Sequence, residues 1–271
     1  MNKTSSSRRA LLASMAAAGL PLSTPSAQAQ AATEKRRLRY AFPVAETGFD
    51  TVKISDLYSR TVTSNIFEAM YRYDHLTRPV QVRPLTAVDL PEVSNEFRSF
   101  KIRIRPGILF ADDPAFKGKP RELVAQDYVY SLQRFADPAT KSVTWGSIEE
   151  SKIVGLNALR KQHMADKKPW NYDREVPGLR ALDRYTLQID LEEPTPRFVQ
   201  LLADNGLYGA VAREVVEAYG EQLAAHPVGT GAFRLKSWRR SSEIVLERNP
   251  NYRERYYEDE ATPTADDVEG Q

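Results

Sequence analysis

Two stretches of the sequence alternate strictly between apolar and polar residues. Residues 99–105 read SFKIRIR and residues 186–192 read TLQIDLE, so every second side chain in each stretch is apolar. This period of two is typical of a β-strand with one buried and one solvated face. Three further strands are predicted: residues 38–44, and the two halves of a hairpin at residues 233–238 and 244–247.

Two longer stretches repeat their apolar residues at the spacing of an α-helix. In residues 56–74, Asp56 is the expected N-cap of a helix. The apolar face of that helix consists of Val62, Ile66, Met70 and Tyr73. In residues 123–138 the corresponding face consists of Tyr128, Leu132 and Phe135, and Pro138 marks the exit. Shorter helices are predicted at residues 198–202 and 212–223.

Strands and helices are therefore interleaved along the chain, with at least one hairpin. This order predicts a mixed fold, either α/β or α+β. The length of 271 residues allows one large domain or two small ones, and 41% hydrophobic residues suffice for a packed core.

The first 29 residues have the features of an export signal. Arg8 and Arg9 precede an apolar run, and Ala27-Gln28-Ala29 fits a small-residue cleavage site. The apolar run is shorter than the roughly 20 residues that span a bilayer. We expect residues 1–29 to be a signal peptide, with the paired arginines favouring the twin-arginine route over the general one. The mature protein is then expected in the periplasm.

Composition excludes several classes of function. The net charge is +2, and Lys3, Arg8 and Arg9 supply three positive charges within the first 29 residues, so the remainder is near neutral. A near-neutral chain lacks the basic footprint of a nucleic-acid-binding protein. Cysteine is absent, which excludes disulfides, thiolate metal sites and a cysteine nucleophile.

The sequence offers little sign of catalysis. The three histidines, His75, His163 and His226, show no spacing that would place two on one helix face, so no metal site is predicted. No serine nucleophile motif occurs, and adjacent carboxylates such as Glu192 and Glu193 point to opposite faces of an extended chain. No catalytic residue and no cofactor is predicted.

Gly229-Thr230-Gly231 does not have the context of a nucleotide-binding loop. Such a loop follows a strand and opens a helix, whereas here a predicted helix precedes and a strand follows. We interpret the glycines as a turn into the strand, with Gly229 or Gly231 at positive φ.

Three stretches of the chain resemble the extracellular solute-binding proteins of peptide-type ABC importers, family 5. The stretch at residues 56–74 is similar to an early family helix, and residues 100–138 resemble a strand, Pro-Gly turn and helix signature. Residues 226–252, HPVGTGAFRLKSWRRSSEIVLERNPNY, resemble a hairpin with the family pattern P-V-G-T-G-P-F, although Ala232 stands where the family usually has proline.

The resemblance implies a type II periplasmic-binding-protein fold of two lobes. Members of the family are much longer, so residues 30–257 are expected to form most of lobe one, residues 258–271 an acidic flexible tail, and the second lobe to be missing. The resemblance also implies a peptide or similar solute as ligand and ABC permease subunits as partners, with a monomeric binding protein. On its own, such a chain is expected to bind its solute poorly or not at all.

Two places are implied as solute contacts. One is the loop Ser55, Asp56 and Leu57, whose backbone could hydrogen-bond an extended peptide. The other is the aromatic region around Trp145. Two other functions stay open: a secreted interaction or chaperone-like module, and a secreted hydrolase with a site assembled over long range. The identity of the solute (dipeptide, longer peptide, nickel chelate, haem or opine) is not predicted.

Overall fold

The computed structural model describes residues 37–256, so the predicted signal peptide and the acidic segment 258–271 lie outside the described residues. Residues 37–41 form a unit of their own without helix or strand, and residues from Phe42 onward form the second unit. The predicted strand at residues 38–44 is wrong: none of these residues is in a strand. Pro43, which has no backbone N–H to donate, interrupts the stretch.

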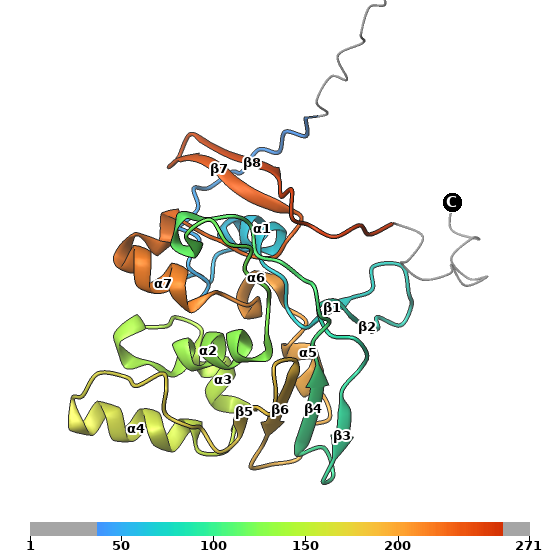
Figure 1. Ribbon diagram of the computed structural model, residues 1–271, viewed down its shortest axis with the longest axis vertical. Helices are drawn as coiled ribbons and strands as arrows, with labels where there is room; N and C mark the ends of the chain where they lie inside the picture. Colours follow the sequence, from blue (N-terminus) through green and yellow to red (C-terminus); the bar gives the residue numbers. More distant parts are fainter. Residues whose placement is uncertain (1–36, 257–271) are drawn as a thin grey trace, which may run out of the picture. The chain divides into compact units, whose positions relative to one another are not determined.

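The second unit mixes helices and strands, as predicted (Figure 1). Its helices are α1 (Leu57–Ile66), α2 (Ala125–Ala136), α3 (Trp145–Glu150), α4 (Leu156–Asp166), α5 (Phe198–Leu201), α6 (Asn205–Tyr208) and α7 (Arg213–Tyr219). Its strands are β1 (Tyr71–Tyr73), β2 (Val82–Pro84), β3 (Glu92–Ser94), β4 (Ser99–Arg103), β5 (Leu179–Ala181), β6 (Thr186–Asp190), β7 (Phe233–Arg239) and β8 (Glu243–Arg248). Short 3-10 turns occur at Pro114–Phe116, Pro138–Thr140 and Gly220–Ala225.

The largest sheet is antiparallel, with the strand order β3-β4-β6-β5. Its two central strands are the two alternating stretches of the sequence, paired so that Phe100 lies opposite Ile189 and Ile102 opposite Leu187. Helix α2 packs against β5 and β6, and its Tyr128, Leu132 and Phe135 are buried in the main core as predicted.

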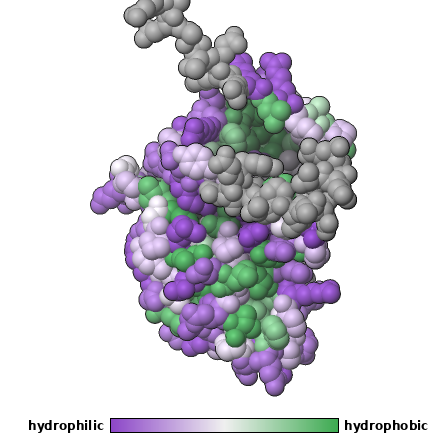
Figure 2. Space-filling model, turned by 90° about the vertical axis from the view of Figure 1, so that its right-hand side faces the viewer, coloured by the Kyte–Doolittle hydropathy of each residue, from purple (hydrophilic) through white to green (hydrophobic). Residues whose placement is uncertain are grey.

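Figure 2 shows that the surface on the right-hand side of Figure 1 mixes hydrophilic and hydrophobic residues instead of presenting one uniform apolar surface.

Helix α1 begins where predicted, with Asp56 as N-cap, but it ends at Ile66 instead of near Asp74. The carbonyl oxygen of Ile66 accepts a hydrogen bond from the backbone N–H of Gly231 at 2.8 Å. This contact, distant in sequence, takes the place of the next helical bond. The chain then turns extended, Met70 enters the core, and Tyr71–Tyr73 pair with β2.

The expectation that Gly229 or Gly231 has a positive φ is wrong, because neither is among the described glycines with positive φ. Both are required for a different reason. A Cβ atom built on Gly229 would lie 2.2 Å from the carbonyl oxygen of Ile66, and one built on Gly231 would lie 2.5 Å from that of Asn65. The two glycines let one backbone segment cross the C-terminal end of α1 at a distance that no side chain permits.

The predicted hairpin is confirmed as β7 and β8, which pair antiparallel around a loop at residues 240–242, with a register shift between Leu235 and Ser237. Its apolar face packs on a second, smaller core that includes Phe49 and residues of α1. The ring of Trp238 packs against that of Phe49 in a tilted arrangement, with centroids 4.8 Å apart, and its indole N–H donates to Glu46. Within the described residues, no helix has both the length and the apolar character needed to cross a membrane.

Candidate functional site

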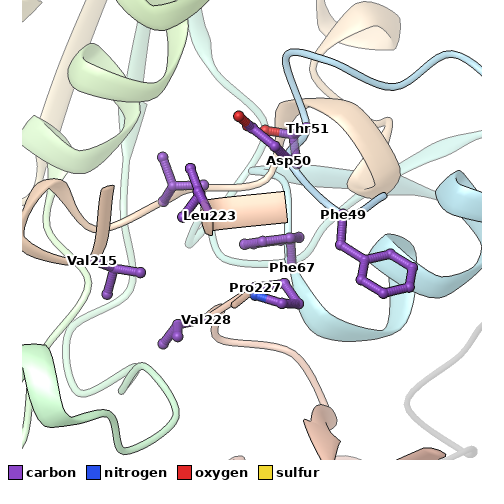
Figure 3. A pocket seen from close by; sticks show the side chains of 9 residues that line it. Phe49, Asp50, Thr51, Phe67, Val215, Leu223, Pro227 and Val228 are labelled. Carbon is purple, nitrogen blue, oxygen red and sulfur yellow. The ribbon is translucent and has the colours of Figure 1, made fainter. Parts of the chain in front are cut away.

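A small apolar cavity lies under the loop at residues 49–51 (Figure 3). Its wall includes Phe49, Phe67, Val215, Leu223 and Val228, and its volume is about 10 Å³. A buried water needs at least about that volume. The cavity can therefore hold a single water molecule at most and is not a solute site.

A much larger depression, with a volume of about 620 Å³, lies along one side of α1. Helix α1 supplies Leu57, Arg60, Thr61, Ser64 and Asn65 to its wall. Residues from three other parts of the chain complete it: Glu68, Arg72, Tyr73, His75 and Leu85 after α1, residues 203–206 at the start of α6, and Gly231, Ala232, Tyr252 and Arg255 around the hairpin.

The polar side chains of α1 in this wall are held by the helix itself. The hydroxyl of Thr61 donates to the carbonyl of Leu57 at 2.8 Å, and both Ser64 and Asn65 donate to the carbonyl of Thr61. Leu57, at the first turn, keeps 68% of its surface exposed. This side of the depression thus combines one exposed apolar side chain with ordered small polar groups.

Another part of the wall is formed at the N-terminus of α6. Asp204 caps this helix by accepting from the backbone N–H of Gly206 at 3.0 Å, and it also pairs with Arg60 of α1. The side-chain oxygen of Asn205 accepts from the backbone N–H of Ala69 at 2.9 Å. These contacts fix α6 against α1, so these two parts of the wall are held in position by the protein itself.

The floor of the depression contains a buried carboxylate, Glu68, whose side chain is 4% exposed. Arg253 binds it with two hydrogen bonds of 2.8 and 2.9 Å. The hydroxyls of Thr230 and Tyr252 donate to the same carboxylate at 3.0 and 3.3 Å. Burial alone would lower the pKa of Arg253, but the hydrogen bonds and charge of Glu68 outweigh burial and raise it.

The loop predicted to contact solute lies at one end of the depression, but its three residues have different surroundings. Leu57 lines the depression and Ser55 is exposed. The carboxylate of Asp56 accepts from the backbone N–H of Ser59 at 2.8 Å and from the hydroxyl of Thr47 at 2.6 Å, so it is already engaged. Their contact with a solute stays a prediction.

The structure does not bring Trp145 to this depression. Trp145 opens α3, is 9% exposed and belongs to the main core. The guanidinium of Arg160 lies 4.8 Å from its ring centroid. Its surroundings are those of a packing residue, and its predicted contact with a solute has no support from the geometry.

Sequence reasoning missed Arg60, Glu68, Asp204 and Tyr252. Glu68 and Tyr252 lie inside stretches that carried the family resemblance, FEAMY and RNPNY, but nothing in either stretch indicates that the two side chains meet. No group of three or more histidines and carboxylates within residues 37–256 is placed to hold a metal ion.

A family model and the similar curated proteins indicate the same family for this chain. Residues 81–269 match the model of the bacterial extracellular solute-binding proteins, family 5 Middle. The periplasmic oligopeptide-binding protein OppA of Salmonella typhimurium is 31% identical over 205 residues, covering 75% of this chain and 34% of OppA. The probable deoxycholate-binding periplasmic protein YgiS of Escherichia coli is 28% identical, covering 88% of this chain and 40% of YgiS.

Solved structures show the same fold. The murein tripeptide-binding protein MppA of Escherichia coli superimposes with a TM-score of 0.60 and 28% identity, over 75% of this chain and 36% of MppA. The pheromone receptor PrgZ gives a TM-score of 0.59 and 26% identity, over 76% of this chain and 38% of PrgZ. The fold is that of the type II periplasmic binding proteins. The chain spans about a third of the length of OppA. From these matches and the shared fold, we conclude that the chain belongs to the bacterial extracellular solute-binding proteins of family 5.

Proposed function

We propose that this chain is the solute-capturing component of an ABC importer, which binds peptides outside the cytoplasm and delivers them to a membrane permease. In this proposal it acts in the periplasm as a monomer, catalyses no reaction and binds no nucleic acid. Family membership supports the capture of a solute. The name of its relative, periplasmic oligopeptide-binding protein OppA, supports a peptide as the solute and the periplasm as the location.

The open depression along α1 is the observation that carries the proposal. Its volume of about 620 Å³ lies within the range of about 300–1,000 Å³ of small-molecule sites. Its wall offers apolar surface from Leu57, Leu85 and Tyr252 beside polar groups that already have partners in the protein. A pre-ordered wall of this kind lowers the entropic cost of binding.

A peptide fits the chemistry of this wall. Peptides combine amide groups with apolar and charged side chains, and the depression presents hydroxyl, amide, carboxylate and guanidinium groups around apolar side chains. We also propose that the main chain of the loop Ser55, Asp56 and Leu57 pairs with an extended peptide. The affinity of the 271-residue chain is expected to be low, because a solute held on one wall stays half solvated and its hydrogen bonds replace those to water with little net gain.

Titration of the purified chain with three probes tests the proposal. The probes are the nonapeptide RPPGFSPFR, found with Haemophilus influenzae OppA, the tetrapeptide STSA, found with Helicobacter pylori DppA, and deoxycholate, for which YgiS is named. We expect saturable binding of a peptide with a dissociation constant of about 1 mM. Binding of deoxycholate alone would support solute capture and contradict the peptide class. Saturable binding of none of the three would contradict the proposal.

A further inference from the structure

Two side chains of the segment that follows β8 bond to one carboxylate, that of Glu68, two residues after the end of α1. Tyr252 and Arg253 both donate to the carboxylate of Glu68, and Arg253 also donates to the carbonyl of Leu85 at 3.1 Å. Tyr252 is one of the lining residues. Its hydroxyl accepts a further bond from Arg255 at 3.2 Å. The carboxylate of Glu68 is therefore one anchor of this part of the wall, and the bonds of Asn251 to the carbonyl of Phe110 and to Asp112 are another.

Both the backbone carbonyl and the side-chain carboxylate of Glu68 accept hydrogen bonds. Its carbonyl oxygen accepts from the hydroxyl of Tyr128 at 2.9 Å and from the backbone N–H of Ala210 at 3.3 Å. Its carboxylate accepts four hydrogen bonds, which matches the number of lone-pair sites that an ionised carboxyl group offers. A carboxylate so saturated has no capacity left for a solute, and with 4% of its side chain exposed it offers almost no surface to one.

We infer that Glu68 is a positioning residue of the solute site, which acts through Arg253 and Tyr252 and not by contact with the solute. Its negative charge holds Tyr252 and Arg253 beside the chain that follows α1 and so contributes to the position of the Tyr252 side of the depression. Where it concerns solute binding, this inference rests on the proposed function.

The negative charge of Glu68, more than its shape, is what holds Arg253. A glutamine has nearly the same shape and keeps one carbonyl oxygen, but it cannot accept two hydrogen bonds from the same guanidinium while neutralising its charge. In Glu68→Gln, Arg253 loses its ionic partner, and a guanidinium that is only 20% exposed turns toward water. We then expect the segment at residues 252–256 to be held less firmly beside residue 68.

Hydrogen exchange of the backbone amides, followed by mass spectrometry, tests the inference without a ligand. In Glu68→Gln we expect exchange at residues 250–256 to become at least about tenfold faster, because a charge-assisted hydrogen-bonded pair is lost. Exchange in α2 and in the β7–β8 hairpin is expected to stay unchanged. Arg253→Gln, altered on the more exposed side of the pair, is expected to give the same local result. Faster exchange throughout either variant, or unchanged exchange at residues 250–256 in both, would overturn the inference.

The matched control is Asp127→Asn, which breaks another two-bond arginine pair, that of Asp127 with Arg121 at 2.6 and 3.0 Å on α2. It is expected to leave exchange at residues 250–256 unchanged.

Titration with the nonapeptide RPPGFSPFR then separates the local effect of Glu68 on residues 250–256 from its effect on solute binding. Weaker binding in Glu68→Gln with unweakened binding in Asp127→Asn supports positioning of the solute site. If the wild-type chain binds none of the three probes but the exchange result holds, the proposed function fails and the Glu68–Arg253 pair stands as a structural contact. Equal loss of binding in both variants would contradict the positioning role.

Discussion

The backbone N–H of Gly231 donates to the carbonyl oxygen of Ile66 at 2.8 Å, at the point where α1 ends. This bond joins the loop before the hairpin to the helix that lines the depression. It requires backbone to lie against backbone, and both Gly229 and Gly231 lie closer to α1 than a Cβ atom would allow.

Replacing either glycine with alanine is therefore expected to destabilise the protein. The added Cβ on Gly229 would lie 2.2 Å from the carbonyl oxygen of Ile66, so backbone has to move. We expect a loss of about 1–3 kcal/mol in the free energy of unfolding, measured by urea denaturation. Gly146→Ala in α3 is the matched control, because a Cβ there has no neighbour within 4 Å and alanine favours a helix. An equal loss in the control would show that the crowding at α1 is not the cause.

The N-cap of α1 gives a prediction that depends on pH. Burial alone would raise the pKa of Asp56, but hydrogen bonds from Thr47 and Ser59 outweigh it and lower the pKa. A carboxyl group with a lowered folded-state pKa stabilises the protein above its unfolded-state pKa, and this contribution disappears as the pH falls through the folded-state value. Asp56→Asn keeps a capping oxygen and is expected to remove this part of the acid sensitivity.

Asp56→Ala is the companion variant for the same cap. It removes the capping oxygen altogether, so we expect a loss of about 1 kcal/mol at neutral pH. Urea denaturation at pH 7 and at pH 3 measures both effects. If Asp56→Asn retains the full acid sensitivity of the wild type between these pH values, the carboxylate of Asp56 does not contribute to it.

A buried ion pair joins the loop before α1 to α2. Arg134 donates to both carboxylate oxygens of Asp50 at 3.0 Å, and the two side chains are 4% and 3% exposed. Arg134→Leu leaves the carboxylate buried without its partner, which is expected to cost about 3–5 kcal/mol. In the double variant Asp50→Asn/Arg134→Leu the cost is expected to be smaller. A double variant that loses the sum of the two single losses would contradict direct coupling.

The predicted signal peptide lies outside the described residues and is tested separately. The mature N-terminus of the protein from a periplasmic fraction is expected to follow Ala29, as read by mass spectrometry. Replacing Arg8 and Arg9 with lysines is expected to block export if the twin-arginine route is used. Recovery of a chain that still begins at Met1 from the cytoplasm would contradict export.

Local patterns predicted the elements whose contacts are local or regular. Helix α2, strands β4 and β6 and the β7–β8 hairpin follow from the spacing of their apolar residues. The end of α1 does not, because its last carbonyl is taken by Gly231, far along the chain. Gln188 also departs from the pattern: it was assigned to the solvated face of β6, yet it is buried and bonds to Ser99 and Asp190.

The candidate site was harder to predict than the fold. Leu57 was named from the family resemblance and lines the depression, and its contact with a solute stays a prediction. The pairs that build the walls join residues far apart in sequence, 144 positions for Arg60 and Asp204 and 185 for Glu68 and Arg253. One sequence without an alignment holds no signal for such pairs.

The central claim is that the depression along α1 is the solute site. Chemical-shift mapping of the ¹⁵N-labelled chain, titrated with RPPGFSPFR, tests it most directly. The account predicts saturable shifts concentrated at Leu57–Asn65, at residues 203–206 and at residues 231–232 and 252. Shifts concentrated around Trp145 and α3, or no saturable shift anywhere, would contradict it.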